Sequence, residues 1–278
     1  YFLASGRQNV NRVIMPWGRG GFTTTMSPYP YGWLDDFLPS ELYENLEDSF
    51  VSPDSHPDLN VLGKGKKRIS FHVPPTPGLL GDFSPDWKDF LEFLSRREVR
   101  ADALEWVRNI LPLESIPHGS YRELFALRHL LTPDQVNWYC EFSSLDPAVY
   151  LPPHTDSVDK LLVFVLYFAP QGWRQEWGGG TEVYSAHDEA CNNNFSNFFL
   201  PHERVTRVDR SDYRPNRVFF FAKNQMAWHG VSPVSSSATL PRRTFNFSLR
   251  VRPDADLPQQ MMDLMAAIRQ FETGAFQQ

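Results

Sequence analysis

The segment Pro152-Pro153-His154-Thr155-Asp156, followed by the apolar run Leu161-Leu162-Val163-Phe164-Val165-Leu166, decides the fold. A short apolar run flanked by turn residues predicts a buried strand. Residues at i and i+2 of an extended chain share one face, so His154 and Asp156 can reach one ion. A second histidine, His229, follows a later aromatic run. Two imidazoles and one carboxylate are the ligands of a facial triad, which binds non-haem Fe(II) and leaves three positions open.

Three alternatives compete for these residues. A histidine two residues before an aspartate arises easily by chance among eight histidines, and His229 alone is equally well explained as a hydrogen-bonded core residue. Two histidines and an aspartate also bind zinc in hydrolases, although no motif for the general base of such an enzyme is evident. The third alternative is a non-catalytic jelly-roll binding module in which the three residues are structural.

The character of the chain changes after Thr132. From there on, short segments rich in aromatic and β-branched residues alternate with turn residues, which predicts strands at 138–143, 160–168, 181–184, 204–208, 217–222 and 243–251. So many short strands pack as a sandwich or barrel. We therefore predict a mainly β fold with flanking helices, in which the core is a double-stranded β-helix (a cupin-like jelly roll).

Helical spacing dominates the other parts of the chain. Apolar residues recur at helical intervals in 42–50, 87–94, 104–111 and 257–273, and Ser84-Pro85 has the form of a helix start. We predict an irregular arm (1 to about 30) and helical support on the substrate side within 1–130, a catalytic jelly roll at 131–252, and a C-terminal helix at 253–278, all sharing one core. The basic run Lys64–Arg68 is expected in a solvated loop, and 188–202 is a candidate lid.

Composition limits the class of protein. A net charge of −6 and a pI near 5.8 argue against a nucleic-acid partner, which would require a basic face. Only two cysteines occur, so a disulfide framework is improbable and a reducing, cytoplasmic location is expected. No apolar stretch reaches the length of a membrane span, so no membrane partner is expected.

Five phrases occur in a recognisable order: Pro153–Ser157, Leu166–Ala169, Trp177–Thr181, His229–Val234 and Arg242–Asn246. In this order and spacing the region from about Tyr139 to Leu249 resembles the Fe(II)- and 2-oxoglutarate-dependent dioxygenases, in particular their prolyl-4-hydroxylase-like branch. The first 130 residues show no such resemblance. The family likeness implies that the triad holds Fe(II) and that 2-oxoglutarate and O2 are cosubstrates.

The resemblance also implies an arginine on the strand after the second histidine, which pairs with the far carboxylate of 2-oxoglutarate through its guanidinium fork. Arg242 and Arg243 both fit by position. In the family this arginine is usually followed at i+2, on the same strand face, by a small or hydroxylated residue, so the resemblance favours Arg242, with Thr244 and Asn246 on its face. The same pocket is expected to include two further residues, Tyr167 and Thr181.

The implied reaction converts 2-oxoglutarate to succinate and carbon dioxide while an unactivated C–H bond of the substrate is oxidised. Halogenases of the superfamily have a small residue where this chain has Asp156, so the resemblance implies hydroxylation or a related oxidation. A small molecule, such as an amino acid or a natural-product intermediate, is the expected substrate. A prolyl or other peptidyl residue is the second candidate, because the nearest branch includes such enzymes.

Overall fold

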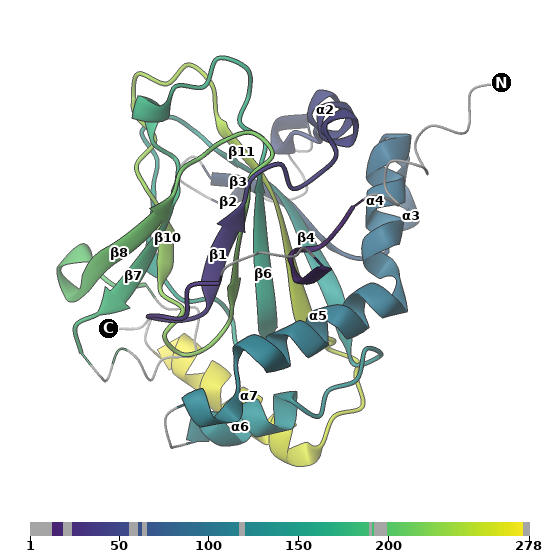
Figure 1. Ribbon diagram of the computed structural model, residues 1–278, viewed down its shortest axis with the longest axis vertical. Helices are drawn as coiled ribbons and strands as arrows, with labels where there is room; N and C mark the ends of the chain where they lie inside the picture. The colour runs from purple at the N-terminus through teal and green to yellow at the C-terminus, as the bar shows by residue number, and fades with distance from the viewer. Residues whose placement is uncertain are drawn as a thin grey trace.

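Two antiparallel sheets form the centre of the molecule (Figure 1). The computed structural model describes residues 13–18, 24–55, 61–62, 66–116, 120–188, 191 and 199–274. The large sheet has the order β1 (Tyr31–Leu34), β9 (Val218–Ala222), β6 (Lys160–Tyr167), β11 (Arg242–Val251), β4 (Val136–Leu145), β3 (Lys66–His72), β2 (Val61–Leu62). The small sheet has the order β5 (Leu151–His154), β10 (His229–Val231), β7 (Thr181–Ala186), β8 (Val205–Ser211). The predicted double-stranded β-helix with flanking helices is confirmed.

Helices cover the face of the large sheet that points away from the small sheet, and its lower end (Figure 1). They are α2 (Ser40–Asp48), α3 (Pro77–Gly81), α4 (Pro85–Ser95), α5 (Arg97–Ile110), α6 (Ser120–Arg128) and α7 (Gln259–Gly274). The start of α4 is as predicted: the Ser84 hydroxyl accepts a hydrogen bond from the Trp87 amide, and Pro85 occupies the first turn. Trp87 then packs on Phe142 and Phe245, with ring centroids 4.6 and 4.8 Å away, which fixes the helix to the sheet.

Strand alternation gives the large sheet two different faces. On β11, Phe245, Phe247 and Leu249 are fully buried in the core cluster that includes the helices. The residues between them belong to the opposite face, which points towards the small sheet and begins with Arg242 and Thr244. On β11 the side chains of this inner face are polar, whereas β6 and β9 contribute apolar ones to the same face, and together they line the space between the two sheets where the candidate site lies.

The described residues before β1 contain only a short 3-10 turn, bends and one isolated bridge. Thr25 pairs with Tyr31, and β1 adds to the edge of the large sheet with Tyr31 opposite Phe221. Tyr29 is almost completely buried. Strand β1 itself was not predicted, because the segment has no apolar period of its own and takes its backbone partners from a strand almost 190 residues later in the chain. Residues 1–12 and 19–23 lie outside the described part.

The basic run was also predicted wrongly. Lys66, Lys67 and Arg68 begin strand β3 and pair with β4. The amino group of Lys67 lies 2.6 Å from Asp54, so a partner distant in sequence neutralises the charge that suggested a solvated loop. Most of the candidate lid, 189–190 and 192–198, lies outside the described residues. Among the helices that are described, none combines the length and the apolar composition needed to cross a membrane.

Candidate metal centre

His154, Asp156 and His229 converge at one point between the sheets. One potential ligand atom from each lies within 4.8 Å of the other two, and all three residues are buried. His154 is directly opposite His229 in the β5–β10 pair, with ring centroids 4.3 Å apart. Strands β5 and β10 of the small sheet position both histidines, and Asp156 follows the end of β5 on the same side.

The backbone determines which nitrogen of each histidine faces the centre. Nδ1 of His154 lies 2.9 Å from the Pro152 carbonyl oxygen, and Nδ1 of His229 lies 3.0 Å from that of Ala227. A carbonyl oxygen can only accept, so both Nδ1 atoms donate and each Nε2 keeps a lone pair for a metal. Burial lowers the pKa of both imidazoles, with the nearby His229 as a further cause for His154. Both rings are therefore neutral, as metal ligation requires.

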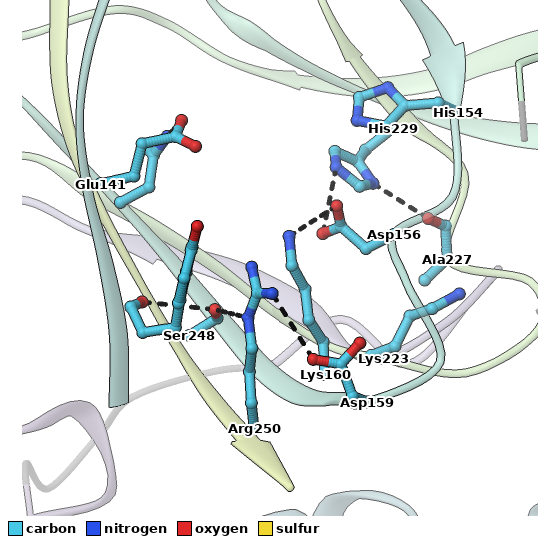
Figure 2. Close-up of polar contacts among 12 residues, drawn as sticks. Glu141, His154, Asp156, Asp159, Lys160, Lys223, Ala227, His229, Ser248 and Arg250 are labelled. Atoms are coloured by element: carbon cyan, nitrogen blue, oxygen red, sulfur yellow. Dashed lines mark hydrogen bonds and ion pairs between the residues drawn. The ribbon is translucent and has the colours of Figure 1, made fainter. Parts of the chain in front are cut away.

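The two oxygens of Asp156 have different partners (Figure 2). Oδ2 faces the histidines, 3.7 Å from Nε2 of His229, whereas Oδ1 lies 2.7 Å from the amino group of Lys160. Burial opposes ionisation of Asp156, but the positive charge and hydrogen bond of Lys160 outweigh it and hold the pKa far below its ordinary value. Lys160 was missed by the sequence analysis, although its position four residues after Asp156 and at the start of a strand could have suggested it.

Aromatic side chains surround the triad. Phe221 packs on the His229 ring at 4.4 Å between centroids, and Phe199 packs on His154 at 5.3 Å. The Tyr29 hydroxyl donates to the backbone oxygen of Trp228, next to His229. These contacts restrict the imidazole rings and keep water away from their outer sides.

Arg242 lies at the other end of the inner face, at the start of β11. It is buried, its Nε donates to the Gly179 carbonyl at 2.5 Å, and its guanidinium carbon lies 5.5 and 5.3 Å from the ring centres of Tyr167 and Tyr213. Burial lowers the pKa of Arg242 from its very high ordinary value, and the guanidinium stays charged. No acidic side chain among the described residues pairs with it.

Three buried polar atoms in this region have no partner among the described residues: Arg242 Nη2, Thr244 Oγ1 and Ser211 Oγ. Buried polar groups in folded proteins are normally hydrogen-bonded. A guanidinium with two hydroxyls is a donor set that suits a carboxylate. The pocket therefore fits an organic acid as its occupant.

The remaining predicted residues divide between this pocket and other places. The Tyr167 hydroxyl donates to Thr181 at 2.6 Å, and Thr181 pairs with Ser211 across β7 and β8, so both belong to the Arg242 pocket. Arg243 points to the opposite face, where its guanidinium lies over Phe50. Asn246 lies further along the inner face and donates to Glu141. Tyr213 and Ser211 were not predicted, since both come from segments without a motif.

One comparison with known proteins matches a family model. Residues 140–250 match the family model of the 2OG-Fe(II) oxygenase superfamily. This part of the chain is therefore similar to that superfamily, as predicted from the sequence, and the family implies Fe(II), 2-oxoglutarate and O2. The donor set agrees, because two neutral imidazoles with a carboxylate suit Fe(II) and the Arg242 pocket suits the cosubstrate's carboxylate. No curated protein sequence matches the chain.

Solved structures of the same fold have little sequence in common with this chain. A prolyl-4-hydroxylase of Pseudomonas putida is 16% identical, with 79% of this chain and 92% of that chain covered and a TM-score of 0.44. A Trichoplax adhaerens prolyl hydroxylase, solved with a peptide fragment of hypoxia inducible factor, is 12% identical over 88% and 90%, with a TM-score of 0.45. The Fe(II)/α-ketoglutarate-dependent dioxygenase TqaL is 12% identical over 82% and 87%, also with a TM-score of 0.45. Likenesses this distant carry no argument about the substrate.

Proposed function

We propose that the protein is a hydroxylase in which His154, Asp156 and His229 hold Fe(II), Arg242 anchors 2-oxoglutarate, and the substrate is a small molecule. One observation carries the proposal. Three buried ligand atoms converge on one side of the inner space, while unpaired donors for a carboxylate lie on its other side, around Arg242. A structural histidine cluster would not require the second feature, and a zinc hydrolase would have no use for it.

Each side chain has a physical role in this reaction. The bound iron supplies the redox chemistry by which 2-oxoglutarate is decarboxylated and a substrate C–H bond is oxidised with O2. The neutral imidazoles present Nε2, and Lys160 holds Asp156 so that Oδ2 faces them. Arg242 and Thr244 fix the cosubstrate by its far carboxylate. Phe221, Phe199 and Tyr29, which pack around the triad, exclude water. Exclusion of water limits side reactions during turnover.

The carboxylate of Asp156 supports hydroxylation over halogenation. One of its oxygens lies within 4.8 Å of a nitrogen of each imidazole. It would therefore be a third ligand to Fe(II) and would take the position that a halide needs. The same inner face, with its ionic side chains, supports a small polar substrate over a prolyl residue of a peptide, which has no charge. Peptidyl hydroxylation remains the alternative function, because the sequence phrases resemble the prolyl-4-hydroxylase-like branch.

The test uses the protein without oxygen. Fe(II) and 2-oxoglutarate added together should produce the weak visible charge-transfer band of the chelate, and admission of air should yield succinate. Asp156→Ala should abolish both signals. Asp134→Ala, an exposed control whose carboxylate pairs with Arg97 and contacts no triad residue, should keep them. Unchanged turnover in Asp156→Ala would remove this residue from the ligand set, and a wild-type protein that binds zinc but never gives the band would favour the hydrolase.

A further inference from the structure

Two cations lie side by side next to the triad. Lys160 and Arg250 are cross-strand neighbours on β6 and β11, and both side chains are largely buried, with 15% and 20% exposed. In Figure 2 the ends of both point into the space that Asp156 and the histidines also face. Like charges at this spacing repel each other. Such a pair is stable only with negative charge nearby.

The negative charge that the described residues supply is incomplete. Lys160 has three donor hydrogens and one acceptor, Oδ1 of Asp156. Arg250 donates through Nε to Ser248 and through Nη1 to Asp159, the latter at 3.5 Å, and its Nη2 has no partner in the described part of the chain. Stacking on Tyr139, with 3.9 Å from the guanidinium carbon to the ring centre, holds Arg250 in place. Free donors of both cations therefore face the same space.

Among the described residues, Glu141 is the other acidic side chain near this space, and it already has partners. Glu141 accepts from Asn246 at 3.0 Å and from Arg68 at 3.2 Å. Burial raises its pKa, but Lys66, Arg68 and Lys160 outweigh burial and keep it ionised. Four cations thus surround the carboxylates of Glu141, Asp156 and Asp159. In a chain with a net charge of −6, such a cation-rich interior is a local exception that attracts anions.

We propose that Lys160 and Arg250 form a subsite that binds a carboxylate of the substrate, so that the enzyme oxidises a small carboxylic acid. This inference rests on the proposed function and adds the substrate class to it. A monoanion suits the subsite better than a phosphate dianion, because Asp159 lies against Arg250 and would repel the second charge.

The experiment compares acids with their amides. The anaerobic Fe(II)–2-oxoglutarate protein is titrated with free L-amino acids and simple aliphatic and aromatic carboxylic acids, each beside its primary amide, and with methyl phosphate. Binding is read from the change in the visible band, and turnover from succinate in air. At least one acid should bind and increase succinate release, and its amide should bind at least about tenfold more weakly, which corresponds to about 1.4 kcal/mol.

Variants then test the assignment. Arg250→Gln should remove most of the preference for the acid and raise its KM about tenfold or more with a smaller change in kcat, and Arg250→Lys should restore part of the preference. Arg210→Gln, an exposed arginine of β8 paired with Asp212, is the matched control and should behave as wild type. Lys160 is unsuitable as the main variant because it also holds Asp156.

Four results would overturn the proposal: no acid binds more tightly than its amide; the preference survives Arg250→Gln; methyl phosphate binds better than every acid; or Arg250→Gln cannot form the band, which would place the arginine in the iron site instead. A wild-type protein that gives no band and no succinate would instead contradict the proposed function. The two failures are therefore distinguishable.

Discussion

Replacement of Arg242 by alanine should weaken 2-oxoglutarate binding far more than the same change at Arg243. The Arg242 guanidinium is buried, and Nη2 has no partner among the described residues, so it can pair with a carboxylate out of water. A hydrogen bond to a charged group contributes about 1.5–3 kcal/mol, and a buried charge that loses its partner costs about 3–5 kcal/mol. We expect a loss of about 3–4 kcal/mol, roughly 100- to 1000-fold in Kd.

The assay is anaerobic titration of the Fe(II) protein with 2-oxoglutarate, followed by the visible band. Arg243→Ala is the matched control, because the neighbouring side chain points to the opposite face and packs on Phe50. Arg242→Lys keeps a positive charge without the fork and should fall between wild type and alanine. Arg242 also packs against Gly179, so unfolding of each variant is measured to separate lost binding from lost stability. A larger loss with Arg243→Ala, or equal affinity in all variants, would refute the assignment.

Three further predictions concern the metal, pH and a turn. Lys160→Gln should weaken Fe(II) affinity about 10- to 100-fold, because the ligand carboxylate loses the partner that orients it; equal affinity by metal titration would contradict this role. The histidines of the triad have pKa values lowered by burial, so below about pH 6.5 the unfolded chain binds more protons than the folded chain. The metal-free protein should therefore lose up to about 1.4 kcal/mol of stability per pH unit for each of these histidines as the pH falls below about 6.5. The measurement is urea unfolding of the wild type and of a variant with both histidines replaced by glutamine. An equal pH dependence in the two proteins would refute the prediction. Gly178→Ala should destabilise the fold by more than about 2 kcal/mol, because φ is +75° and the added carbon would lie 2.3 Å from the Pro233 carbonyl oxygen. Gly172→Ala, with φ of +89° and open space around it, should cost only about 1–2 kcal/mol. Equal unfolding midpoints of the two variants would contradict the steric argument.

Local chemistry was sufficient to predict several elements. Ser84 and Pro85 predicted the start of α4 because a cap depends only on residues within one turn. Alternation along β11 predicted that Arg242 and Phe245 have opposite environments, because successive strand residues point to opposite faces. The triad residues were found in the same way, from the spacing of His154 and Asp156 and the family phrase around His229.

Interactions between distant segments could not be predicted. Tyr31 finds its partner at Phe221, and Arg250 finds Lys160, only when strands far apart in the chain align in one register. The sequence by itself determined which residues could bind a metal and an organic acid, because ligand chemistry belongs to the residue type. Only the tertiary structure decided that both histidines come from one sheet and that Arg250 lies beside the site. Register and burial depend on cross-strand packing, which no local pattern encodes.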